Sequence, residues 1–210
     1  MLIYPDDEET RERAARVVAA CGIIAFRTDT FYGLGADPFN AASLGDLNEL
    51  KGREGKPILV LVSDLAYTER LVARKSRAFG ALAARHWPGA LTLVVKARRE
   101  VPELLTAGTC TVGVRLPEDA EARAIVRACG GALTATSANP SGLPPARTAL
   151  EVARYFPRGL GLIVDGGRAR TEFPSTVLDV SGARPRLIRE GVVHVRELEE
   201  TLTSIGAALA

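Results

Sequence analysis

The apolar residues of this chain fall into short runs of four to six residues, each bounded by polar or turn-forming residues. Runs of this length predict buried β-strands, whereas apolar residues that recur every three or four positions predict amphipathic helices. We expect strands at Ile23–Phe26, Ile58–Val62, Leu91–Lys96, Thr111–Arg115, Ala132–Thr136, Leu162–Asp165, Thr176–Val180 and Arg186–Arg189. We expect helices at Ala41–Leu50, Asp64–Val72, Lys75–Arg85, Ala120–Cys129, Thr148–Tyr155 and Val195–Leu202, and another that Asp6 and Asp7 cap and Gly22 ends. Because helices and strands do not alternate strictly, the pattern predicts an α+β fold with a mixed sheet rather than a doubly wound parallel sheet.

The 210-residue chain is long enough to bury a sizeable core without disulfides or a structural metal. It contains no linker-like segment, internal repeat or low-complexity tract, so we expect a single domain over residues 1–210. Its three cysteines are widely spaced and form no CxxC pair, which argues against a disulfide framework or zinc site and indicates a cytoplasmic location. No secretory signal opens the chain and no apolar run approaches ~18 residues, so we expect no membrane partner.

Basic and acidic side chains are nearly balanced, at 27 against 25, which gives a formal net charge of +2. This balance excludes a strongly basic nucleic-acid-binding module of the histone type. Only four of the basic residues are lysines, and two of them, Lys51 and Lys56, flank Arg53 within six residues. Three cations between a predicted helix and a predicted strand can converge on one polyphosphate. The alternative interpretation is a solvated loop, which this feature taken alone favours.

The common nucleotide-binding motifs are absent. The segment Gly52–Pro57 has the wrong glycine spacing for a phosphate loop, and Gly33–Gly35 lacks the third glycine of a dinucleotide motif. The sequence therefore supports neither a Walker-type NTPase nor a Rossmann oxidoreductase. His86 and His194 have no nucleophile or metal-ligand partner at a diagnostic spacing, and we assign them no catalytic role.

Three polar features lie at the ends of predicted strands. The segment Thr134–Gly142 is rich in hydroxyl groups that can bind phosphate or ribose, although a turn is the alternative interpretation. Arg115 ends a strand, where a guanidinium can hold a carboxylate; the alternative is a surface arginine. Ser175 and Thr176 precede an apolar run, where they either serve a site or only begin a strand.

Taken together, seven segments resemble the motifs of the YrdC family. They are Arg27–Gly35 (RTDTFYGLG), Lys51–Arg53, Lys56–Pro57, Trp87–Thr92 (WPGALT), Val114–Pro117 (VRLP), Ser137–Asn139 (SAN) and Ser175–Val177 (STV). Their order and approximate spacing also match, over Gly22 to Gly191. Motifs in this order are far more specific than any one of them.

The resemblance implies an α+β fold in which a twisted mixed sheet and flanking helices surround a large basic cavity. It also implies an activity, the synthesis of threonylcarbamoyl-AMP and pyrophosphate from L-threonine, bicarbonate and ATP. The product serves the threonylcarbamoylation of an adenosine in tRNA, so downstream tRNA-modification proteins are implied partners. Mg²⁺ is expected to bind through the ATP phosphates, with no metal ligand from the protein, because the chain has no carboxylate cluster.

Site residues follow from the positions that match the family motifs. The implied catalytic residues are Lys51, Arg53, Ser137 and Asn139. The implied ATP-binding residues are Arg53, Lys56, Thr111, Ser137 and Arg189. The implied threonine-binding residues are Thr30, Arg115, Ala135 through its backbone, and Ser175.

The chain departs from the family pattern at three places. Leu61 stands where many members have a histidine, Pro145 stands where some have a serine, and the loop before Lys56 is one residue shorter than the commonest form. Two other functions therefore stay open. One is a non-catalytic module that binds double-stranded RNA or tRNA in the same cavity, and the other is a paralogue that adenylates a different amino-acid carbamate.

Overall fold

The computed structural model describes residues 3–52 and 55–210. The strands are β1 (Ile3–Pro5), β2 (Ile24–Arg27), β3 (Tyr32–Gly35), β4 (Val60–Val62), β5 (Leu91–Lys96), β6 (Thr111–Arg115), β7 (Ala132–Thr134), β8 (Thr136–Ser137), β9 (Leu162–Asp165), β10 (Thr176–Asp179) and β11 (Arg186–Arg189). The helices are α1 (Glu8–Ala19), α2 (Ala41–Lys51), α3 (Arg77–His86), α4 (Glu103–Thr106), α5 (Ala120–Ala128), α6 (Ala149–Tyr155), α7 (Val195–Thr203) and a 3-10 helix, η1 (Leu65–Arg70).

The strands form two mixed sheets. The first has the order β1-β9-β2-β3-β8, and the second has the order β11-β10-β5-β6-β4-β7. Both combine parallel pairs, such as β2 with β9 and β4 with β6, and antiparallel pairs, such as β2 with β3 and β5 with β6. The predicted α+β fold with mixed β-pairing is therefore confirmed, with the strands divided between two sheets.

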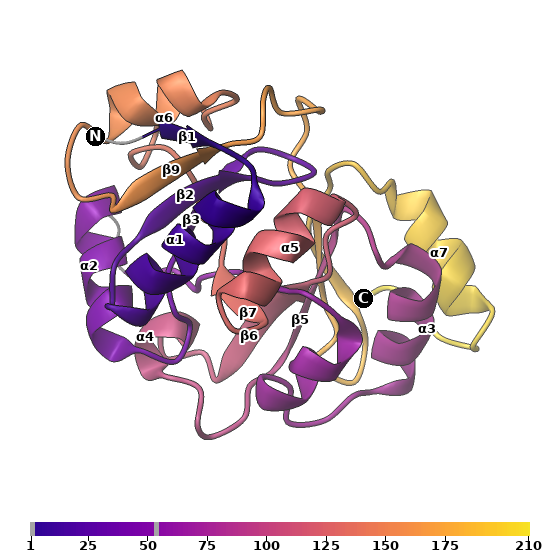
Figure 1. Cartoon of the computed structure of the whole chain (residues 1–210). Coiled ribbons are helices and arrows are strands. Elements are labelled where there is room, and N and C mark those ends of the chain that lie inside the picture. Colours follow the sequence, from indigo (N-terminus) through magenta and orange to yellow (C-terminus); the bar gives the residue numbers. More distant parts are fainter. Residues whose placement is uncertain (1–2, 53–54) are drawn as a thin grey trace.

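Helices α1 and α5 lie side by side and cover the two sheets (Figure 1). α1 contacts β2 and β9 of the first sheet, and α5 contacts β4 and β7 of the second. The apolar side chains between these layers include Val18, Phe26, Ile125 and Leu133, all of them buried. Helices α3 and α7 pack against each other at the other end of the molecule (Figure 1). Among the described residues, no helix is long and apolar enough to cross a membrane.

Local sequence signals set where several helices begin and end. Asp7, Asn40 and Asp119 each accept a hydrogen bond from the backbone N–H three residues later, at 2.8–3.1 Å. Such caps satisfy amides that have no partner within the helix. Gly52 adopts the left-handed conformation at φ 56° and ends α2. The caps that the sequence predicted at Asp7 and Asn40 are therefore confirmed.

Strand β3 was not among the predicted strands, because its sequence, Tyr-Gly-Leu-Gly, is half glycine and glycine is depleted in strands. Here the glycines allow close packing of layers. A Cβ on Gly35 would lie 2.7 Å from the side chain of Leu133 and 2.9 Å from that of Phe26. Strand β3 pairs with β2 on one side and with β8 on the other. It therefore lies between the Thr28–Phe31 turn and residues 135–143, which we call the Ser137 segment.

Candidate functional site

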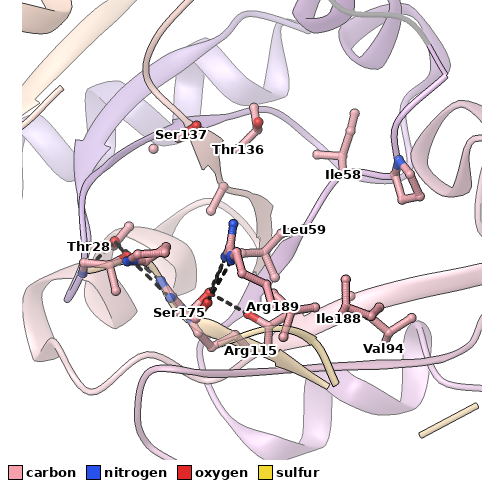
Figure 2. Close-up of a pocket in the computed structure, with 18 of the residues that line it drawn as sticks. Thr28, Ile58, Leu59, Val94, Arg115, Thr136, Ser137, Ser175, Ile188 and Arg189 are labelled. Atoms are coloured by element: carbon pink, nitrogen blue, oxygen red, sulfur yellow. Dashed lines mark hydrogen bonds between the residues drawn. The ribbon is translucent and has the colours of Figure 1, made fainter. Parts of the chain in front are cut away.

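A cavity of about 670 Å³ is lined by residues from both sheets (Figure 2). Its walls combine apolar side chains with many hydroxyl groups. The hydroxyl-bearing residues of the lining are Thr28, Thr30, Tyr32, Thr92, Thr109, Thr111, Thr136, Ser137 and Ser175. The charged residues of the lining are Arg115, Asp179, Arg186 and Arg189. Because arginines outnumber acids there, the described part of the lining favours an anionic ligand.

Arg115 ends β6 and is only 2% exposed, although it carries a full positive charge. Its Nη2 lies 2.9 Å from Oδ1 of Asp29, and its two Nη atoms lie 3.4–3.5 Å from the hydroxyls of Thr28 and Thr30. Its Nε has no hydrogen-bond partner in the described part of the chain. Burial lowers the pKa of Arg115, and the charge of Asp29 opposes that shift. The guanidinium therefore keeps donor capacity at the wall of the cavity, which suits a carboxylate.

The Thr28–Phe31 turn between β2 and β3 places Thr30 beside Arg115. The Thr28 hydroxyl donates to the carbonyl of Phe31 at 2.8 Å and accepts from the N–H of Thr30 at 3.2 Å. These bonds close a tight turn in which the two threonine hydroxyls lie 3.2 Å apart. Thr28 therefore fixes both Thr30 and, through its contact with Nη2, Arg115.

Ser175 and Arg189 form a second polar group in the lining of the cavity (Figure 2). Arg189 donates to the carbonyl of Ser175 from Nη2 at 2.8 Å and from Nε at 3.2 Å, while the Ser175 hydroxyl lies 3.0 Å from that of Thr92. Burial lowers the pKa of Arg189, and the positive charge of Arg115 lowers it further. The two positive charges repel each other, and an anion bound beside them would offset this repulsion.

The Ser137 segment forms the remaining polar wall. Lys51 is buried at the end of α2, and its Nζ donates to the carbonyl of Ser137. Asn139 donates from Nδ2 to the carbonyls of Pro140 at 3.0 Å and Leu143 at 2.6 Å, which shapes the loop that follows. Lys51 and Asn139 thus contact the backbone of the segment and are not part of the cavity lining.

The structure brings most of the predicted site residues to this one cavity. Those that line it are Thr30, Thr111, Arg115, Ala135, Ser137, Ser175 and Arg189. Lys56 is described but does not line it, and Arg53 lies outside the described residues. The N–H of Ala135, predicted as a backbone contact, already donates to the carbonyl of Leu59 at 2.9 Å.

Sequence reasoning gave no role to Thr28, Asp29 and Thr92, which hold the predicted residues in place. Thr92 lies in the WPGALT motif, and its position in β5 is the signal that could have identified it. Residues two positions apart in a strand point to the same face. Thr92 and Val94 are related in this way in β5, and both line the cavity. Asp29 is adjacent to Thr30 in sequence, but its pairing with Arg115 depends on a contact between residues far apart in the chain.

Comparisons with known proteins show which proteins the chain resembles. A family model for Sua5, YciO and YrdC proteins, described as "Telomere recombination", matches residues 16–191. The threonylcarbamoyl-AMP synthase of Thiobacillus denitrificans is 42% identical over 161 residues, which are 76% of this chain and 85% of that protein. The threonylcarbamoyl-AMP synthase of Pyrococcus abyssi is 34% identical over 193 residues, which are 91% of this chain and 57% of that protein.

Solved structures give the same result. The structure of P. abyssi Sua5 complexed with L-threonine superimposes with a TM-score of 0.91 at 32% identity, over 99% of this chain and 61% of that chain. This chain therefore spans about three-fifths of the length of P. abyssi Sua5. Escherichia coli YciO, at 24% identity and a TM-score of 0.82, shares the fold. The resemblance noted from the sequence motifs is confirmed, and the chain belongs to the Sua5/YciO/YrdC family.

Proposed function

We propose that this chain is a threonylcarbamoyl-AMP synthase, which condenses L-threonine, bicarbonate and ATP to threonylcarbamoyl-AMP and pyrophosphate. The observation that carries the proposal is Arg115, a buried guanidinium with spare donor capacity between the hydroxyls of a cavity. Relatives of the chain carry the name of this activity, and the P. abyssi structure that matches 99% of the chain contains L-threonine.

The amino-acid subsite is formed by Arg115 with Thr30, Ser175 and Ala135. The guanidinium of Arg115 takes the substrate carboxylate, because planar donors on a guanidinium match the two carboxylate oxygens. Thr30 and Ser175 both line the cavity, and their hydroxyls suit the polar groups of the amino acid. Ala135 lies at the start of the Ser137 segment and completes this side of the subsite.

The nucleotide subsite is formed by Arg189, Thr111 and Ser137. Arg189 supplies the positive charge that ATP phosphates require, and the two hydroxyls supply hydrogen bonds to the nucleotide. Lys51 and Asn139 serve the reaction through the Ser137 segment that they hold. We place Arg53 and Lys56 on the phosphates from the family motif alone.

In the proposed reaction, the protein itself takes little part in the covalent chemistry. The amine of threonine attacks bicarbonate and gives a carbamate with loss of water. A carbamate oxygen then forms a bond to the α-phosphorus, and the bond to the β-phosphate oxygen breaks to release pyrophosphate. Arg115 and Arg189, which both line the cavity, hold the two reactants in line, and the cations neutralise charge that develops on the phosphates.

Mg²⁺ would be held by the triphosphate of ATP and would supply further charge neutralisation. Asp29 beside the cavity and Asp179 in its lining are each already paired with an arginine, at 2.9 and 3.5 Å. The described residues contain no cluster of three His, Cys, Asp or Glu side chains that fits a metal. Three free cysteines fit a reducing, cytoplasmic site of action.

The experiment that tests the proposal is pyrophosphate release with threonine, bicarbonate, Mg²⁺ and ATP, with threonine omitted as the control. We expect Arg115→Met and Arg189→Ala to abolish the threonine-dependent release, and Arg196→Ala on the exposed face of α7 to leave it unchanged. A panel of other amino acids in the same assay detects a paralogue with a different substrate. Absence of any threonine-dependent release would refute the proposal.

A further inference from the structure

Two buried ion pairs join the Thr28–Phe31 turn to the segment that begins at Arg115. In the inner pair, Asp29 lies 2.9 Å from Arg115, which lines the cavity. In the outer pair, Nη2 of Arg27, at the end of β2, lies 3.0 Å from Oδ2 of Asp119. Arg27 is 8% exposed and Asp119 is 2% exposed, and neither is among the described residues that line the cavity. The reaction proposed above gives the outer pair no role.

The charges of the two segments match in one direction only. Residues 27–29 read Arg-Thr-Asp and residues 115–119 read Arg-Leu-Pro-Glu-Asp, so each segment begins with a cation and ends with an anion. The segments pair in opposite order, and each arginine therefore lies opposite an aspartate. Pairing in the same order would place like charges together, which electrostatic repulsion opposes. The two ion pairs thus select the register in which the guanidinium of Arg115 lies beside the turn.

Asp119 fixes one end of the outer pair to helix α5. Its Oδ1 accepts from the N–H of Ala122 at 3.1 Å and caps the helix, while its Oδ2 lies beside Arg27. Arg123 of the same helix donates to the carbonyls of residues 117 and 118 at 2.6 and 2.7 Å. Because α5 packs against β4 and β7, the position of Asp119 is set by the second sheet and not by the turn.

Arg27, at the other end of the outer pair, packs against the loop of residues 166–175 that follows β9. A Cβ on Gly166 would lie 2.8 Å from Nε of Arg27, so the backbone of the loop passes close to the guanidinium. Arg170 of this loop lies 4.0 Å from Oδ2 of Asp119, but it is 63% exposed and this contact adds little. The outer pair therefore contacts the turn, the start of α5 and the loop that ends at Ser175.

Arg115 of the inner pair has to serve both the turn and the substrate. Its contacts with the hydroxyls of Thr28 and Thr30 are 3.4–3.5 Å long, which is near the limit for a hydrogen bond. A substrate carboxylate would also compete with Asp29 for the donors of the guanidinium. The outer pair lies outside the cavity lining and keeps its contacts whether the site is empty or occupied. A binding site needs such supporting contacts to hold its geometry.

We propose that Arg27 and Asp119 are positioning residues for the amino-acid subsite. The outer pair fixes the turn that carries Thr30 relative to the strand end that carries Arg115, and Arg27 also supports the loop that carries Ser175. Because these three segments supply amino-acid-binding residues, loss of the outer pair should weaken binding of the amino acid more than binding of ATP. The inference rests on the proposed function, since it assigns two further residues to that site.

The main test variant is Asp119→Asn, which removes the charge and keeps both the size of the side chain and the helix cap. A second variant, Arg27→Met/Asp119→Asn, removes both charges and so leaves no unpaired charge in the interior. Arg27→Lys is the conservative variant, because it keeps the charge. The matched control is Asp6→Asn, which removes a carboxylate that is 8% exposed and lies 2.6 Å from Nε of Arg11, on the side of α1 and outside the cavity lining.

Two measurements on the full chain separate positioning from stability. Pyrophosphate release with one substrate varied and the other saturating gives kcat and a KM for threonine and for ATP. Equilibrium dialysis with labelled L-threonine, without ATP, gives a Kd that needs no turnover. Thermal unfolding of every variant gives the temperature below which the protein is fully folded, and both measurements are made there.

We expect Asp119→Asn and the double variant to raise the KM and Kd for threonine by about tenfold, because a displacement of ~1 Å in a binding group can cost up to about 100-fold. The KM for ATP should stay within about twofold, as should every constant of Asp6→Asn. Arg27→Lys should recover most of the loss, to within about threefold of the natural chain.

A purely structural role predicts a different result. Partial unfolding lowers the concentration of active protein, which reduces kcat and leaves both KM values unchanged. That result, or an equal rise in the KM values for threonine and ATP, would overturn the inference. Threonine binding that the outer-pair variants weaken, without any pyrophosphate release from the natural chain, would support the inference and refute the proposed function. A natural chain that neither binds nor uses threonine would refute both.

Discussion

Replacement of Asp29 by asparagine removes the charge that balances Arg115 and retains the size of the side chain. Asp29 Oδ1 lies 2.9 Å from Nη2 of Arg115, and the two side chains are only 10% and 2% exposed. Loss of one partner from a buried pair leaves the other charge uncompensated and costs about 3–5 kcal/mol. We therefore expect Asp29→Asn to lower the free energy of unfolding by about 3 kcal/mol, because the amide keeps one acceptor for Arg115.

Coulomb's law gives a similar magnitude for the loss of this ion pair. Unit charges 4 Å apart attract by about 4 kcal/mol at an effective dielectric of 20. For a chain of this length, a loss of that size lowers the Tm by roughly 6–12 °C. The same substitution should increase the thermal stabilisation that threonine gives, because the substrate carboxylate then supplies the only negative charge at Arg115.

Urea denaturation followed by far-UV circular dichroism measures the change, within a double-mutant cycle of Asp29→Asn, Arg115→Met and the double variant. We expect the double variant to be more stable than either single variant, with a coupling energy of about 2–3 kcal/mol. If the single losses simply add, or if Asp29→Asn costs less than about 1 kcal/mol, the pair does not hold the site and the reasoning fails.

Three further predictions concern stability and cysteine reactivity. Partial burial lowers the pKa of His86, so the unfolded chain binds a proton that the folded chain does not. Stability should therefore fall as pH decreases below about 6.5 in urea titrations, and His86→Gln should reduce this slope. Burial raises the pKa of Cys129 to about 12, whereas Cys110 is exposed. Iodoacetamide at mildly alkaline pH should therefore label Cys110 quickly and Cys129 only after unfolding. Mass spectrometry of the labelled protein measures both rates. Gly35→Ala should cost about 1–3 kcal/mol in urea denaturation, because its Cβ would lie 2.7 Å from Leu133; an unchanged midpoint would contradict this packing.

Sequence patterns predicted the fold best where the apolar period was clear. The bounds of β5, β6, β9 and β11 agree with the predicted ranges, because their residues alternate or are rich in β-branched side chains. The helical pattern at Asp64–Val72 forms a 3-10 helix, η1, whose start Asp64 caps through the N–H of Ala66 at 2.9 Å. Strand β1 escaped prediction because three residues are too few to show a period, and its pairing with β9 comes only from the assembled sheet.

Most residues of the candidate site could be predicted from the sequence, but the contacts between them could not. Arg115 was identified by its place at a strand end, and its burial agrees with a site rather than with a surface arginine. Its partner Asp29 and the bond between Thr92 and Ser175 join residues more than eighty positions apart. No local pattern encodes such contacts, because they depend on how the two sheets meet around the cavity.

The register of β4 shows what the departure from the family pattern at Leu61 changes in the site. Leu61 pairs in register with Arg115 of β6, is fully buried, and packs in the apolar cluster that contains Phe26 and Leu133. A histidine at this position would place a group that titrates near neutral pH beside the guanidinium. With leucine there, the charged residues that act on Arg115 and Arg189 are Asp29 and the arginines themselves. With leucine at position 61, the proposed amino-acid subsite has no imidazole beside Arg115, and we expect selection of the substrate to rest on the Thr30 and Ser175 hydroxyls.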